Sequence, residues 1–144
     1  MDHYTYSDYL KWDDDVRREL IDGVVYLMAG PNRKHQKILG NMYLIFGNFL
    51  KGKPCEVYLA PFDVRLNADT LDDTVVQPDI MIVCDHSIMT DAGIAGVPSL
   101  LVEILSTNTS SRASSSPSRF PPLLSLILIP LCSGGLWLAV IMIP

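Results

Sequence analysis

The sequence predicts a single α/β or α+β domain built around a mixed β-sheet. Two observations carry this prediction. A long helical pattern in the first half of the chain is followed by three strand-like runs, an order typical of mixed α and β domains. Two of these runs hold nearly continuous apolar stretches, which are typical of strands covered on both faces. The length of 144 residues suits one domain and leaves little room for a second.

The first thirty residues predict a short helix and a hairpin. Residues 5–15 carry an apolar stripe at helical spacing, with Thr5 or Ser7 as the N-cap. Residues 19–28 have the pattern of two short strands around Asp22-Gly23, a pair that strongly favours a tight hairpin turn.

The clearest predicted element is a helix over residues 33–51. Its apolar residues recur at helical spacing, its polar face holds lysine, glutamine and asparagine, and Gly52 and Pro54 end it. The strand-like runs cover residues 56–66, 75–84 and 99–105. An acidic loop over residues 69–74 and a longer connection over residues 85–98 complete this part of the chain.

Composition argues against an affinity driven by a basic surface. The chain has 11 basic and 16 acidic residues, and Arg112 and Arg119 are the only charged residues after Ser106. A nucleic-acid partner would need metal ions to offset its phosphates, or a local basic cluster. Three widely spaced cysteines without a Cys-x-x-Cys pair argue against a disulfide framework and a thiolate zinc site. The N-terminus lacks a signal-peptide pattern, so we expect a protein of the reducing cytoplasm.

Three carboxylates stand in unusual settings. Glu103 lies inside the apolar run of the last strand, Asp79 follows Pro78 at the start of an apolar strand, and Glu19 precedes the first strand. An ionised carboxylate in a buried strand is unfavourable unless it is paired or bound to metal. The alternative for Glu103 is a strand with one wet face, from which its side chain points outward. Pro78-Asp79 by itself can simply start a strand.

Other polar residues leave alternatives open. His35, near the start of the long helix, either packs or caps, as most such histidines do, or approaches a phosphate at the helix N-terminus. Asp63 either belongs to a site or hydrogen-bonds a turn. We expect Arg33, Lys34 and Lys37 to form a solvated helix face, with phosphate contact as the alternative.

The order and spacing of several motifs resemble the PD-(D/E)XK nuclease superfamily and, more narrowly, the Uma-type restriction endonucleases. The resemblance covers nearly all of residues 4–112. The matching motifs are Glu19-Leu20-Ile21-Asp22-Gly23, His35, Pro61-Phe62-Asp63-Val64-Arg65-Leu66, Gln77-Pro78-Asp79-Ile80 and Val102-Glu103-Ile104-Leu105-Ser106.

The resemblance implies a restriction-endonuclease-like mixed sheet flanked by helices, with a metal site at one edge. Asp79 and Glu103 would match the two metal-binding carboxylates, and Glu19 the acidic residue near the first helix, so these three are the expected catalytic residues. The implied cofactor is Mg²⁺ or Mn²⁺ and the implied partner is DNA, while a homodimer stays open. Mg²⁺ binds a few carboxylate oxygens, keeps several waters and offsets phosphate charge, which would let an acidic domain meet DNA.

The resemblance fails after Ser106. The family continues through a turn into a helix with an aspartate and a lysine, and then an aromatic strand. Here the two positions fall on Ala113 and Pro117, and no lysine follows Lys53. We therefore expect an incomplete domain over residues 1–109, truncated at its last helix and strand, and an atypical tail over residues 110–144. Losing such an electrostatic group costs roughly 100- to 1,000-fold in rate, so this copy is expected to be impaired or inactive.

The tail, Ser/Pro-rich and then apolar, has three interpretations. The abrupt loss of acidic residues and lysines favours a frameshift. The uncharged run over residues 123–143 could instead be a membrane anchor, since about 20 residues span a bilayer, although Pro130 and Gly134-Gly135 weaken it as a helix. A disordered or partner-binding extension fits least, because the tail is too apolar. The alternatives to a nuclease are accordingly a non-catalytic degenerate fold that binds nucleic acid or protein, and a tail-anchored membrane protein.

Overall fold

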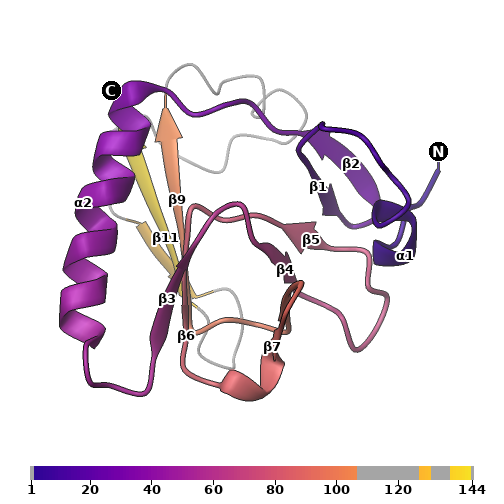
Figure 1. The fold of residues 1–144 in the computed structure, drawn as a ribbon. Helices are drawn as coiled ribbons and strands as arrows, with labels where there is room; N and C mark the ends of the chain where they lie inside the picture. The colour runs from indigo at the N-terminus through magenta and orange to yellow at the C-terminus, as the bar shows by residue number, and fades with distance from the viewer. Residues whose placement is uncertain (1, 107–126, 131–136, 144) are drawn as a thin grey trace.

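The computed structural model describes residues 2–106, 127–130 and 137–143, and it arranges them in three layers. The long helix α2 (Arg33–Leu50) covers one face of a five-stranded sheet, and a second, six-stranded sheet lies on the opposite side (Figure 1). The five-stranded sheet has the order β10-β11-β9-β6-β3, with bounds Ile127–Pro130, Trp137–Ile143, Leu100–Ser106, Ile80–Val83 and Glu56–Leu59. The six-stranded sheet has the order β2-β1-β5-β4-β8-β7, with bounds Val24–Leu27, Arg18–Ile21, Val75–Val76, Asp63–Arg65, Gly93–Ala95 and Met89–Thr90.

The N-terminal elements agree with the sequence pattern, apart from the length of the first helix. Helix α1 spans only Tyr6–Tyr9, and Thr5 and Asp8 cap it reciprocally. Strands β1 and β2 form the expected antiparallel hairpin, with Ile21 paired to Val24. The turn between them puts Asp22 and Gly23 at φ 50° and 75°, the left-handed conformation that this kind of hairpin turn requires.

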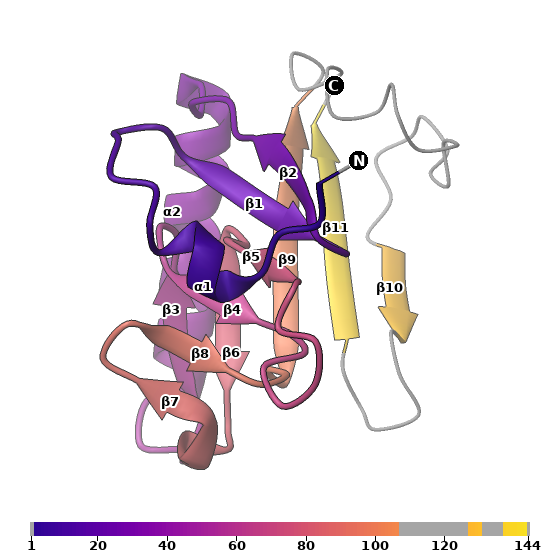
Figure 2. The ribbon, with the colours of Figure 1, turned by 90° about the vertical axis from the view of Figure 1, so that its right-hand side faces the viewer.

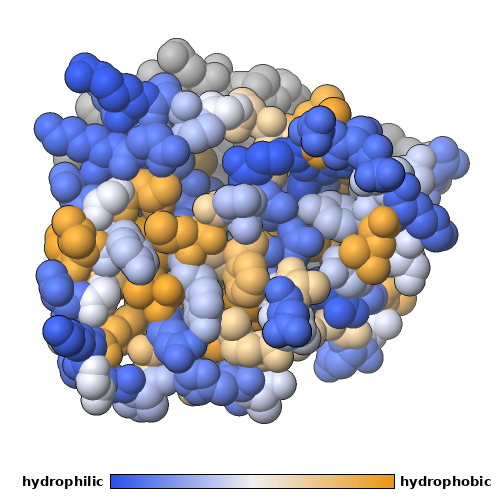
Figure 3. All heavy atoms as spheres, viewed as in Figure 1, coloured by the Kyte–Doolittle hydropathy of each residue, from blue (hydrophilic) through white to orange (hydrophobic). Residues whose placement is uncertain are grey.

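Helix α2 is confirmed within one residue of the predicted range. Asn32 caps it, since its side chain accepts a hydrogen bond from the backbone N–H of His35 at 2.9 Å. The predicted solvated face is also confirmed, because Arg33, Lys34 and Lys37 are exposed. Four large hydrophobic side chains of α2 are exposed as well: Tyr43, Leu44, Ile45 and Phe49. Figure 3 shows hydrophobic and polar residues intermixed on this face of the molecule.

Two of the predicted strands each divide into two. The run over residues 56–66 forms β3 in one sheet and β4 in the other, and the run over residues 75–84 forms β5 and β6 in the same way. Pro61 and Pro78 stand at the two breaks. Proline has no N–H for a strand ladder, so the chain leaves one sheet there and joins the second. The predicted connection over residues 85–98 contains a short 3-10 helix, His86–Ile88, and strands β7 and β8.

The argument against a disulfide framework did not foresee one bond between two of the three cysteines. Cys55 precedes β3, Cys84 follows β6, and the two form a disulfide. These strands are antiparallel with Glu56 opposite Val83, so the next pair in the register is Cys55 and Cys84, whose Cα atoms are 4.1 Å apart. The two cysteines are 29 residues apart in the sequence, and they become neighbours only because β3 pairs with β6.

The tail contributes two strands to the five-stranded sheet. Strand β11 runs parallel to β9, from Trp137 opposite Leu100 to Ile143 opposite Ser106, and β10 pairs with β11 (Figure 2). Strand β9 is therefore not an edge strand. The expected loss of the family helix, with Ala113 and Pro117, concerns residues outside those described. Within the described ranges, no helix is long and apolar enough to cross a membrane.

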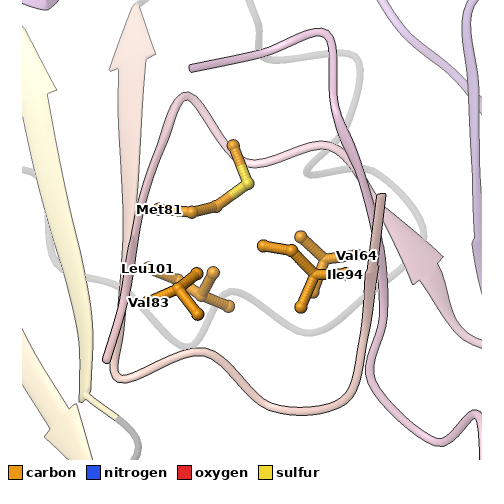
Figure 4. Close-up of a cluster of buried hydrophobic side chains, with 5 residues drawn as sticks. All are labelled: Val64, Met81, Val83, Ile94 and Leu101. Carbon is orange, nitrogen blue, oxygen red and sulfur yellow. The ribbon is translucent and has the colours of Figure 1, made fainter. Parts of the chain in front are cut away.

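Hydrophobic side chains fill the space on both faces of β6 and β9. Between the two sheets, buried residues from four strands form one cluster (Figure 4): Val64, Met81, Val83, Ile94 and Leu101. On the other face, Ile80 and Val102 pack under α2, against Leu39, Met42 and Phe46. Strand β6 is buried along its whole length, as its unbroken apolar run predicts. These two cores hold β6 and β9 rigidly side by side.

Candidate active site

A cleft of about 170 Å³ opens where the start of α2 meets the ends of β6 and β9. Residues 28–31, before α2, and residues 60–61, after β3, form part of its lining. The lining residues that carry side-chain chemistry are Arg17, His35, Gln36, Gln77, Asp79 and Glu103.

The two carboxylates predicted to bind metal both line this cleft. Strands β6 and β9 are antiparallel, with Ile80 opposite Val102. Continuing this register by one pair places Asp79, one residue before β6, opposite Glu103 in β9. Directly opposed residues of an antiparallel pair have Cβ atoms about 4.5–5.5 Å apart. The pairing of β6 and β9 therefore brings together carboxylates that are 24 positions apart in the sequence.

The carboxylate of Asp79 is held by two hydrogen bonds to one oxygen. The backbone N–H of Ile104 donates to Oδ2 at 2.7 Å, and Nε2 of His35 lies 3.1 Å from the same oxygen. The Asp79 and His35 side chains are only 16% and 13% exposed. Because Pro78 precedes Asp79 and β6 begins after it, the side chain supplies the acceptor that Ile104 needs at this end of the ladder.

His35 reaches the cleft from the first turn of α2. Besides its contact with Asp79, its Nδ1 atom is buried and has no hydrogen-bond partner in the part of the chain described. Neither sequence interpretation foresaw this contact, since capping is done by Asn32 and the imidazole faces a carboxylate. A buried polar atom without a partner is uncommon in folded proteins.

Glu19 lies beside the cleft rather than among the residues that line it. Glu19 is buried, with 5% of the residue exposed, and its Oε1 accepts a hydrogen bond from the backbone N–H of Gln77 at 3.0 Å. This bond joins β1 to the segment that leads into Asp79. Glu19 is therefore placed to fix the backbone two residues before Asp79.

Gln77 connects this backbone to a partly buried polar network. Its side-chain Nε2 donates to Asp63 Oδ1 at 2.8 Å, and Tyr9 donates its hydroxyl to the same oxygen at 3.1 Å. Burial and the nearby Asp63 carboxylate raise the pKa of Tyr9 to about 12. Asp63, which the sequence left open, thus belongs to a network next to the cleft and holds Gln77 in place.

Arg17, Gln36 and Gln77 line the cleft although the sequence alone gave none of them a role in a site. Gln77 stands inside the motif that ends in Asp79, but an amide carries no signal of its own. Arg17 is the first of two arginines immediately before an acidic strand residue. That basic pair was the available signal, and its significance depends on the fold, in which Arg17 lines the cleft and Arg18 does not.

The donors present fit a hydrated divalent ion rather than an enclosed protein cage. No group of three or more His, Cys, Asp or Glu side chains that could hold a metal occurs in the described part of the chain. Mg²⁺ binds through one or two carboxylates and keeps several waters, so the Asp79 and Glu103 pair matches its preference. Among the described residues that line the cleft, His35 is the one histidine and there is no cysteine, a set that does not fit thiolate or multi-histidine metal chemistry.

Comparisons with known proteins identify the family and the fold. A family model named Uma2 and described as "Putative restriction endonuclease" matches residues 6–115. The structure also resembles the crystal structure of a protein described as a putative nuclease from Anabaena variabilis ATCC 29413, with a TM-score of 0.56 and 20% sequence identity. The match covers 76% of this chain and 65% of that chain, and at this identity it shows a shared fold. No curated protein is detectably similar in sequence. Because the family model covers well over half of the 144 residues, the chain belongs to the Uma2 family.

Proposed function

We propose that this chain carries a metal-dependent site for the hydrolysis of DNA phosphodiester bonds. The observation that carries the proposal is the convergence of Asp79 and Glu103 on one cleft from adjacent, rigidly packed strands. Membership of the Uma2 family and the nuclease-like fold support it. Mg²⁺ or Mn²⁺ would be held by Asp79 and Glu103, and Glu19 would assist by fixing the Gln77 backbone.

When bound, the divalent ion would neutralise phosphate charge and lower the pKa of a coordinated water. The folded chain fixes the positions of the two carboxylates that would hold the ion. The Ile104 N–H fixes Oδ2 of Asp79, so the carboxylate is positioned before any ligand arrives. The packing of Ile80 and Val102 under α2 holds the two strand ends at a constant separation.

The lysine position of the family falls on Pro117, outside the described residues. Among the described residues no lysine lines the cleft. Since removing one group that stabilises transition-state charge lowers rate by about 100- to 1,000-fold, we propose weak activity for this copy.

One observation favours a non-catalytic alternative. His35 and the Ile104 N–H both contact the same oxygen of Asp79, so the carboxylate already has partners without a metal. A degenerate fold that binds nucleic acid without cleaving it would keep this arrangement.

The cytoplasmic location stays a prediction. The Cys55–Cys84 disulfide argues against it, because disulfides persist more readily in oxidising compartments.

The test compares Asp79→Ala with Asp69→Ala, which removes an exposed carboxylate in the acidic loop. Binding of Mn²⁺ is measured by calorimetry, and cleavage of plasmid and single-stranded DNA is measured with Mg²⁺ or Mn²⁺. We expect Asp79→Ala to lose metal binding and residual cleavage, and Asp69→Ala to keep both. Equal metal affinity and equal cleavage in the two variants would contradict the site. DNA binding without cleavage, in a wild-type chain that binds no metal, would support the degenerate fold.

A further inference from the structure

Arg17 lines two neighbouring hollows. One is the cleft with Asp79 and Glu103, and the other, of about 290 Å³, lies on the side of α1. Gln77 is the second residue that the two hollows share. The remaining lining of the second hollow consists of Tyr9, Trp12, Asp14, Asp15, Val16 and Arg18.

The guanidinium of Arg17 is held by a neutral oxygen. Its Nε and Nη2 both donate to Oε1 of Gln77, at 3.2 and 2.9 Å. A guanidinium has five N–H donors, so this arrangement uses two and leaves others for an anion. Arg18 and Arg65, in contrast, are each paired with a carboxylate, Asp14 and Asp72 respectively. Within the described residues no ion pair compensates the charge of Arg17.

The position of Arg17 is fixed in advance by the network behind it. Gln77 is held at its backbone by Glu19 and at its side chain by Asp63, so the oxygen that orients Arg17 has little freedom. An arginine side chain loses rotamer entropy when it binds a ligand, and ordering it beforehand removes part of that loss. In the second hollow Asp14 is paired with Arg18, which leaves the exposed Asp15, while Asp79 and Glu103 line the cleft on the other side of Arg17.

We infer that Arg17 is the phosphate-binding residue of this site, and that a nucleic-acid backbone passes it from the cleft into the second hollow. The inference rests on the proposed function, because it takes a phosphodiester as the ligand. Arginine suits this role, since its planar fork matches phosphate oxygens and it stays charged at every physiological pH. A positively charged Arg17 at this position would let a chain with a net charge of −5 bind a polyanion next to two carboxylates.

The test measures the binding of fluorescent single-stranded and duplex DNA to the full-length chain by anisotropy. Each titration is made in EDTA and in Ca²⁺, over a series of salt concentrations. Arg17→Gln is compared with Lys53→Gln, which removes the same charge from the far end of α2, where Lys53 lies over the Phe49 ring. Arg17→Lys keeps the charge without the fork. Circular dichroism melting shows whether each variant is folded.

We expect Arg17→Gln to bind DNA roughly 10- to 100-fold more weakly, and the slope of log affinity against log salt to fall by about one. Lys53→Gln should match the wild type, and Arg17→Lys should recover only part of the loss. If the wild type binds DNA and Arg17→Gln binds it equally with the same slope, the inference about Arg17 is wrong and the proposed function stands. If the wild type binds no DNA in either buffer, both are wrong. Should Arg17→Gln prove unfolded, Arg17→Lys decides, since full wild-type affinity there would contradict the need for the fork.

Discussion

The Cys55–Cys84 disulfide should contribute a large share of the stability of this small domain. The bond joins the ends of β3 and β6 and closes a loop with a sequence separation of 29. In the chain-entropy account, cross-linking a loop of this length removes about 3.5 kcal/mol of conformational freedom from the unfolded state. We expect the Cys55→Ser/Cys84→Ser variant to lose about this much unfolding free energy. Because small proteins have urea slopes of about 1–3 kcal/mol per molar, its midpoint should fall by ~1–3 M.

Two measurements check this prediction. Urea unfolding of the double variant is compared with that of Cys132→Ser, which changes the cysteine outside the pair, and with that of the wild type after reduction by dithiothreitol. Thiol titration of the air-oxidised chain in denaturant should find Cys55 and Cys84 unreactive before reduction and all three cysteines reactive after it. Three reactive thiols before reduction, or identical midpoints for the wild type and the double variant, would refute the reasoning.

Two further predictions concern the core and the polar network. Ile80→Ala should lower the unfolding free energy by about 2–5 kcal/mol, because Ile80 is fully buried under α2, whereas Leu44→Ala, at a position 62% exposed, should change it by less than about 0.5 kcal/mol. Urea unfolding distinguishes them, and equal losses would contradict the packing. The pKa of Tyr9 is raised from 10.0 to about 12, so the folded state favours its protonated form. That stabilisation is complete below pH 10 and is lost as the pH rises toward 12. Tyr9→Phe should therefore lose less stability than the wild type over this range in melts at increasing pH, and parallel losses would contradict the shift.

Local patterns predicted the elements whose signals lie within a few residues. The stripe of apolar residues defined α2, Asp22-Gly23 defined the hairpin turn, and the unbroken apolar run defined β6 as a buried strand. The sequence pattern did not predict that the runs over residues 56–66 and 75–84 each divide into two strands. Pro61 and Pro78 interrupt a ladder only when the two halves pair with different neighbours, and those neighbours come from elsewhere in the chain.

The candidate site shows the same division. The residue types and their order around Asp79 and Glu103 were enough to propose a carboxylate pair and a family. Their opposition across β6 and β9 depends on strand register, which the folded sheet decides. The contact of His35 with Asp79, and the bond from Arg17 to Gln77, likewise join elements from different parts of the fold.

The sequence by itself therefore determined the α and β composition, the position of α2, the two cleft carboxylates and the family. Only the tertiary structure decided that Cys55 meets Cys84, that Glu19 supports Gln77 rather than lining the cleft, and that Arg17 faces two hollows. The physical reason is the separation along the chain of the residues that interact. Helix periodicity and turn preference act between near neighbours in the chain, whereas hydrogen bonds, disulfides and clefts join residues that become neighbours only when strands pair and layers pack.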